Sequence, residues 1–209
     1  MHAPAAFSVT DPDVLADAVA AYPLATLLIN GADGPQAAHL PLVAERHDAP
    51  GSAIVSLVGH MARANPFWRD AQGAAALAVL HGPDGYISPA WYAAKTEHGR
   101  VVPTWNYLKV EARGTLHIEA DAAAVAPYVE APTTLMESRR PDPWALSDAP
   151  ADYVESMLRG VVGVRLEISH IQGSWKLSQN RDAADRAGAI RGLREAGHTA
   201  LADLMEQAP

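Results

Sequence analysis

The chain has 209 residues, a formal net charge of −8 and no cysteine, and 49% of its residues are hydrophobic. Without cysteine, disulfides, thiolate metal sites and cysteine nucleophiles are excluded, and the negative charge argues against a large basic surface for nucleic acid. The first residues show no signal-peptide pattern, and no apolar run is long enough to span a bilayer. We therefore expect a cytoplasmic protein with no membrane partner.

The first third of the chain predicts a capped helix followed by a hairpin. Asp11 is a suitable N-cap because its carboxylate can accept bonds from free backbone N–H groups, and apolar residues follow it at helical spacing. Two β-prone segments flank the turn residues Asn30–Gly34, which is the pattern of a hairpin. In chain order we expect a helix at 11–22, strands at 24–29, 36–43 and 53–58, and a helix at 61–70.

The remaining two thirds predict three further strands, two of them longer than those in the first third. Apolar and polar residues alternate over a long stretch that begins at Thr104, as expected for a strand with one buried face. In chain order we expect a strand at 74–80, a turn at 81–85, a strand at 104–119, a helix at 121–131, a proline-rich bridge at 132–150, a helix at 152–159, a strand at 161–171 and a charged helical tail.

These elements indicate an α+β protein built on a small antiparallel barrel, because short strands recur at close spacing with helices between them. The chain shows no internal repeat and no low-complexity block. A parallel βαβ pattern with a glycine-rich phosphate loop is missing, which argues against a Rossmann or P-loop protein.

The segment from Gly59 to Pro66 contains a candidate phosphate site. We expect it where a strand ends and a helix begins, and unpaired backbone N–H groups at such a junction attract anions. Arg63 adds a permanently charged planar donor, and His60 and Asn65 could complete the cradle. The alternative is an ordinary helix start with an exposed arginine.

The stretch from Gly85 to Tyr107 is the densest in aromatic and small polar side chains. Aromatic faces beside hydroxyl and amide groups are typical of a pocket for a flat ligand with a polar edge. Buried polar groups also need partners, which such a ligand supplies. The alternative is a barrel corner stiffened by proline and packed with aromatic residues. The candidate lining residues are Ser88, Trp91, Thr104, Trp105 and Asn106.

A third polar cluster follows Trp175. Lys176, Ser178, Gln179 and Asn180 could reach phosphate oxygens or the carbonyl-rich edge of a ring. The alternative is a solvated helix cap.

Other common site chemistries find little support in the sequence. The nine histidines are scattered, with no pair at ligand spacing, so we expect no metal site. A nucleophile elbow for Ser/His/Asp catalysis is also missing.

Several of these short motifs, taken together and in order, resemble the PaiB-like family of FMN-binding negative transcriptional regulators. The resemblance covers essentially the whole chain, although Ala90 stands where the family often has serine. The motifs are Ala38–Leu42, Gly59–Asn65, Tyr86–Tyr92, Val102–Tyr107, Pro143-Trp144 and Lys176–Asn180.

The resemblance implies a split-barrel fold, six-stranded, antiparallel and Greek-key-like, with peripheral helices and a C-terminal helical tail. It implies FMN as the cofactor, bound between the two subunits of a homodimer, which agrees with the alanine-rich composition. Residues 1–180 would form the FMN-binding domain. Residues 181–209 would form the tail, as part of the same domain or of the dimer interface.

The resemblance also assigns roles to the candidate residues. His60, Arg63 and Asn65 would lie on the phosphate side, because split-barrel flavoproteins hold the phosphate near the strand that leads into the first helix. The Ser88–Asn106 candidates would line the ring or substrate side, and the Lys176–Asn180 candidates would close the site, from the same or from the other subunit. No catalytic residue is identified, and His60 and Tyr92 are the first to test.

Three functions follow as hypotheses. The first is an FMN-dependent oxidoreductase or flavin-linked regulator that acts on a small molecule, with the flavin supplying the electron chemistry. The alternative is a repressor that acts on DNA directly or through a partner, which the net charge and the lack of a helix-turn-helix pattern disfavour. The third is a haem-binding or haem-degrading split barrel that would use His60 or His170.

Overall fold

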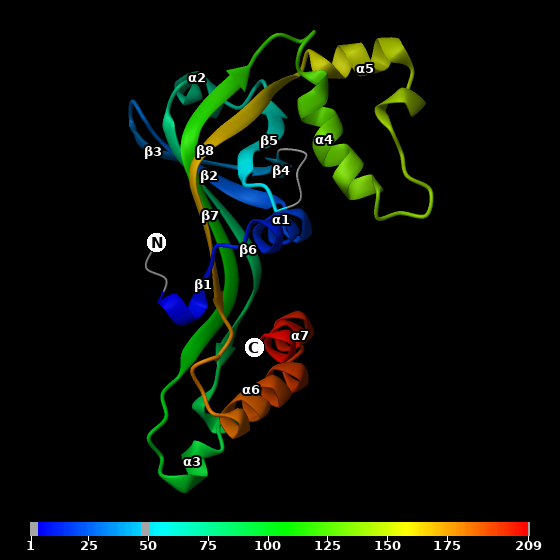
Figure 1. The fold of residues 1–209 in the computed structure, drawn as a ribbon. Coiled ribbons are helices and arrows are strands. Elements are labelled where there is room, and N and C mark those ends of the chain that lie inside the picture. The colour runs from blue at the N-terminus through cyan, green and yellow to red at the C-terminus, as the bar shows by residue number, and fades with distance from the viewer. Residues whose placement is uncertain (1–3, 47–50, 209) are drawn as a thin grey trace. The chain divides into compact units, whose positions relative to one another are not determined.

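The computed structural model describes residues 4–46 and 51–208 and divides the chain into two compact units. Unit 1 consists of residues 1–9, 81–109 and 172–209, and unit 2 of residues 10–80 and 110–171. The predicted boundary at residue 180 therefore does not coincide with this division, because the helical tail belongs to unit 1 together with two segments from earlier in the chain. Figure 1 labels the elements of both units.

The described residues form an antiparallel sheet of eight strands in the order β3-β2-β6-β7-β8-β5-β4, with β1 paired to β8. Sequence analysis predicts six strands, and the count differs partly because the two-residue β1 and the four-residue β4 are too short to be read from periodicity. The strands are β1 (Ser8–Val9), β2 (Leu24–Gly31), β3 (Gly34–Pro41), β4 (Val43–Arg46), β5 (Ile54–Ala62), β6 (Ala75–Ile87), β7 (Thr104–Glu119) and β8 (Val161–Lys176).

Seven α-helices accompany this sheet in the described part of the chain, which confirms the α+β class. Asp11 caps the first helix as predicted, because its carboxylate accepts bonds from the backbone N–H groups of Asp13 and Val14. The helices are α1 (Pro12–Ala21), α2 (Phe67–Ala71), α3 (Ala94–Glu97), α4 (Ala126–Glu137), α5 (Ala151–Leu158), α6 (Ala183–Glu195) and α7 (Thr199–Gln207).

Unit 2 contains the β2–β3 hairpin that the sequence predicts, in a register that pairs Leu24 with Pro41. Alternate residues of β2 are buried, so one face of the hairpin contributes to the core. Arg165 of β8 ties two neighbouring strands together, because its guanidinium pairs with Glu45 of β4 and donates to Ser56 Oγ of β5 at 2.9 Å.

Several local predictions were wrong. The segment 61–70 is not one helix, since β5 continues to Ala62 and α2 is only five residues long. The segment 81–85 is not a turn, because β6 runs through it to Ile87. The helix expected at 121–131 begins later, at Ala126, where Pro127 suits the first turn of a helix.

Unit 1 has its own hydrophobic core, in which α6 and α7 pack side by side (Figure 1). Two glycines of α6 let the helix approach the 3₁₀ turn Pro89–Trp91. A Cβ on Gly188 would lie 2.0 Å from the Trp91 carbonyl oxygen, and one on Gly192 would lie 2.2 Å from the Trp91 ring. The buried core residues are Ile87, Tyr92, Leu177, Ala189, Leu193, Leu201, Ala202 and Met205.

None of the helices in residues 4–46 and 51–208 has the length and apolar content that a membrane span requires. Within the same ranges, no three His, Asp or Glu side chains are grouped so that they could hold a metal ion.

Candidate functional site

The candidate residues that sequence analysis assigns to one site belong to different units. His60, Arg63 and Asn65 are in unit 2, whereas the candidates at 88–106 and 176–180 are in unit 1.

In unit 2, the polar groups of the proposed phosphate cradle are already used by the chain itself. Arg63 Nε donates to the Arg159 carbonyl at 2.9 Å, and Arg63 Nη2 donates to the carbonyls of Ala120 and Val161 at 2.7 and 3.0 Å. Asn65 Oδ1 accepts from the Phe67 N–H at 3.1 Å. The anion-binding junction is also missing, because α2 is a single short turn.

His60 also bonds to another part of the chain. Its Nδ1 lies 3.1 Å from the carbonyl oxygen of Tyr128, in the helix α4. The cradle residues thus connect β5 with the segments around it.

We expect Arg63→Ala to lower the stability of the protein by about 1–3 kcal/mol, because it leaves three carbonyl groups without their charged donor. Chemical denaturation of the two proteins measures this change. FMN affinity of the folded variant should stay within about twofold of wild type. A tenfold loss of FMN affinity with unchanged stability would instead show that Arg63 binds the phosphate.

In unit 1, two pairs of predicted residues meet across β7 and the end of β8. Lys176 Nζ donates to Thr104 Oγ1, and Asn106 Nδ2 donates to Ser178 Oγ at 2.8 Å. Thr104 and Asn106 are two residues apart on β7, so their side chains lie on the same face of the strand. The sequence could not show these contacts, since the partners are 72 residues apart.

This cluster contains buried polar atoms without a partner. In the described part of the chain, Tyr92 Oη, Asn106 Oδ1 and Ser174 Oγ are buried and receive no hydrogen bond, and all three belong to unit 1. Leaving a buried polar group unpaired costs about 1–3 kcal/mol. Three such atoms in one unit indicate that a polar ligand or bound water completes the cluster.

Backbone strain is found at the same place. Ser178 has a φ of +63°, and it is the only residue other than glycine with positive φ among those the structure describes. Its side chain is buried and accepts from Asn106. Strain of this kind tends to be kept at functional sites, where it holds a side chain in position.

Two positive side chains give the cluster its charge. The guanidinium of Arg181 lies 4.7 Å from the centroid of the Tyr92 ring. Burial lowers the pKa of Lys176, and Arg181 lowers it further because the two cations repel each other. Burial raises the pKa of Tyr92. Among the nearby charges, Arg181 opposes this shift and Asp185 adds to it. Tyr92 is therefore a neutral hydrogen-bond donor at neutral pH.

The aromatic candidates do not share one wall. Trp105 lies between Thr104 and Asn106 in sequence, so its side chain points to the other face of β7, where it is 55% exposed. There it packs edge-to-face on Tyr86 beside a pocket of about 440 Å³ that Tyr107 and Lys109 also line. Trp91 packs against α6 instead.

The three other candidates have local roles. Ser88 Oγ caps the 3₁₀ turn by accepting from the Ala90 N–H. Gln179 bonds within its own loop, to the Leu177 N–H and the Trp175 carbonyl. Asn180 is exposed.

Sequence analysis misses two residues of the cluster, Arg181 and Asp185. Asp185 is 2% exposed and accepts from the Ala94 N–H at 3.0 Å, which fixes α6 against the segment that carries Tyr92. Arg181 could have been found from its position directly after the Lys176–Asn180 motif. Asp185 gave no such signal, because an acid inside a charged helical tail looks like a solvated residue.

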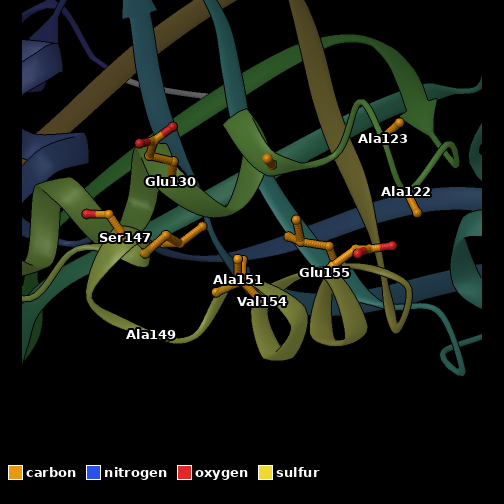
Figure 2. A pocket seen from close by; sticks show the side chains of 11 residues that line it. Ala122, Ala123, Glu130, Ser147, Ala149, Ala151, Val154 and Glu155 are labelled. Atoms are coloured by element: carbon orange, nitrogen blue, oxygen red, sulfur yellow. The ribbon is translucent and has the colours of Figure 1, made fainter.

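A pocket of about 650 Å³ in unit 2 is a poor alternative for an anionic cofactor. Figure 2 shows its mainly aliphatic lining from α4, α5 and the segments before them. The charged residues of the lining are two acids, Glu130 and Glu155, and no basic residue is among them. A phosphate group would be repelled there.

Comparison with known proteins places the chain. A family model described as "Putative FMN-binding domain" matches residues 1–170. Protease synthase and sporulation protein PAI 2 of Bacillus subtilis is 31% identical over 214 residues, which cover 99% of this chain and 97% of that protein. The family model thus includes Thr104 and Asn106 but ends before Lys176, whereas the Bacillus relative spans both segments.

Two solved structures are similar in fold. The FAD and haem binding protein from Mycobacterium smegmatis matches with a TM-score of 0.59 at 18% identity, over 87% of this chain and 79% of that one. Flavocytochrome Anf3 from Azotobacter vinelandii matches with a TM-score of 0.56 at 15% identity, over 87% and 75% of the two chains.

Proposed function

Because the chain belongs to the FMN-binding domain family, we propose that it is a flavin-dependent oxidoreductase that holds FMN at the polar cluster of unit 1. The family match and the Bacillus relative confirm the resemblance to the PaiB-like family, and FMN is the cofactor of the family. The observation that carries the proposal is the set of three buried polar atoms without a partner in unit 1.

The residues of this cluster suit FMN chemically. FMN combines an anionic phosphate, a ribityl chain with hydroxyl groups and a ring with carbonyl and N–H groups at its edge. Lys176 and Arg181 are cations for the phosphate, whereas Asn106 Oδ1 is an acceptor and Tyr92 Oη a donor. A ligand with both donors and acceptors would therefore pair the atoms that the chain leaves unpaired.

When bound, the flavin supplies electron and hydride transfer, and the protein supplies binding and orientation. Tyr92 would donate a hydrogen bond, since its raised pKa keeps the hydroxyl protonated. Ser178, held in a strained backbone conformation, would fix the amide of Asn106. Asp185 would position Tyr92 through the Ala94 N–H rather than touch the ligand.

The closed six-stranded barrel and the homodimer belong to the same proposal. A second subunit would cover the apolar side chains that unit 1 leaves exposed, among them Trp105 and Val102, which are 55% and 63% exposed. The net charge of −8 gives no support to direct DNA binding.

The purified protein is expected to bind one FMN per chain and to show the absorption bands of a flavin after incubation and gel filtration. Spectra recorded before and after addition of FMN measure this directly. Tyr92→Phe should lower the affinity, because it removes the unpaired donor while keeping the ring beneath Arg181. A protein that stays colourless at saturating FMN would exclude the proposed function.

A further inference from the structure

The helices α4 and α5 of unit 2, with the segment between them, leave large apolar side chains uncovered. Both helices lie wholly within the described residues, and there α5 has no buried residue and α4 buries only Pro132. Trp144, Tyr153 and Met157 are 46%, 57% and 52% exposed. An exposed apolar patch of this kind is typical of a place where a ligand or a partner binds.

The surface between these helices is concave. The pocket of about 650 Å³ adjoins a second cavity of about 130 Å³, because Leu146, Ala149, Val154 and Leu158 line both. We call the two together the α4–α5 pocket. A concave and mainly apolar pocket of several hundred Å³ is typical of a small-molecule site. The concavity therefore favours a small ligand over a second copy of the chain as the occupant.

The charges at the α4–α5 pocket are negative. Glu130 of α4 and Glu155 of α5 line it, and its lining includes no basic residue. Figure 2 shows their two carboxylates on opposite sides of the aliphatic side chains. Glu130 is exposed, and its carboxylate has no ion pair or hydrogen bond among the described residues. A positively charged ligand would therefore be attracted, and an anion repelled.

Arg159 does not close this site to a cation. Its Nη1 lies 2.9 Å from Glu155 Oε1, but the two side chains are 57% and 77% exposed. An exposed pair one helical turn apart adds little stability. Arg159 can therefore turn back to water when the cation of a ligand takes its place beside Glu155.

We propose that the α4–α5 pocket is a second binding site, which takes an organic cation with an apolar body, such as a hydrophobic amine or a quaternary ammonium compound. The apolar body would rest on Leu146, Val154 and Leu158, and the charge would lie near the two glutamates. The hydrophobic effect would supply most of the affinity, and the carboxylates would select the sign of the charge. All lining residues belong to unit 2, so this inference goes beyond the proposed function and does not depend on flavin binding.

The test uses tetraphenylphosphonium and tetraphenylborate, two ions of nearly the same size and shape and of opposite charge. Isothermal titration calorimetry of the full chain measures the affinity for each ion. We expect the wild type to bind the cation at least tenfold more tightly than the anion. Glu130→Gln should weaken cation binding by about two- to fivefold, and the double variant Glu130→Gln/Glu155→Gln should lose most of the preference.

Asp142→Asn is the matched control. Asp142 is exposed, lies between α4 and α5 in sequence and is not part of the lining, and its replacement changes the net charge by the same amount as Glu130→Gln. This control should bind both ions as the wild type does. Equal affinity of the wild type for the two ions would refute the proposal, and so would a full preference in the folded double variant. If the double variant does not fold, Glu130→Gln against Asp142→Asn decides.

A second copy of the chain is the other possible occupant, and Tyr153→Ser tests it. Analytical ultracentrifugation should give the same mass for this variant as for the wild type, because Tyr153 faces a small ligand in our proposal. A wild-type dimer that becomes a monomer in Tyr153→Ser would show that a second copy covers this surface, and would overturn the proposal.

Discussion

Replacing Lys176 with methionine is expected to weaken FMN binding while raising the stability of the free protein. The loss of one charged hydrogen bond to the phosphate costs about 1.5–3 kcal/mol, which is a decrease in affinity of about ten- to a hundredfold. The stability should rise because burial and Arg181 both disfavour the ammonium group. Each kcal/mol of relief raises the melting temperature of a chain of this size by about 2–4 °C.

The free energy of unfolding should also depend on pH through Lys176. The pKa of Lys176 is lower in the folded chain than in the unfolded chain, so the unfolded chain binds more protons between these two values. The free energy of unfolding of the wild type therefore rises with pH from the lowered pKa up to the ordinary lysine value of about 10.4. Lys176→Met should lack this rise.

Thermal denaturation and flavin titration of the same preparations check both effects. Lys95→Met, at an exposed position of α3, is the matched control and should change neither quantity. A lower melting temperature with unchanged FMN affinity would show that Lys176 serves the fold through Thr104 alone.

The regular elements were readable from the sequence wherever a local signal determined them. The Asp11 cap and the β2–β3 hairpin depend on residues that are neighbours in the chain, and β7 was predicted with its observed bounds, Thr104–Glu119. The errors occur where tertiary pairing overrides local signals. His81–Gly85 has turn-forming residues, but β6 continues through it as part of the sheet.

The candidate site was predictable in composition but not in arrangement. Sequence analysis groups Thr104, Trp105 and Asn106, whereas strand alternation separates Trp105 from the other two. Arg63 was a phosphate candidate by residue type alone, because a sequence does not show that its guanidinium donates to three backbone carbonyls. Asn106 and Ser178 are 72 positions apart, and only the fold brings their side chains together.

The close packing of α6 on Trp91 predicts the largest loss of stability. Gly188→Val is expected to cost about 3 kcal/mol or more, which lowers the melting temperature by about 6–12 °C. A Cβ at this position would lie 2.0 Å from the Trp91 carbonyl oxygen, and a backbone atom cannot move aside as a side chain can. The helix would have to shift away from the segment that carries Tyr92.

The exposed neighbour Ala187 provides the control, since Ala187→Val tests valine in the same helix without the contact. Its cost should stay below about 0.7 kcal/mol, the difference in helix propensity. Gly188→Ala sharpens the test, because propensity alone would stabilise the helix by about 1 kcal/mol, whereas the contact with Trp91 should destabilise it. A higher melting temperature for Gly188→Ala would mean that α6 does not pack on Trp91 this closely. The contact also links stability to binding, because any shift of α6 moves Asp185 and, through the Ala94 N–H, the support of Tyr92.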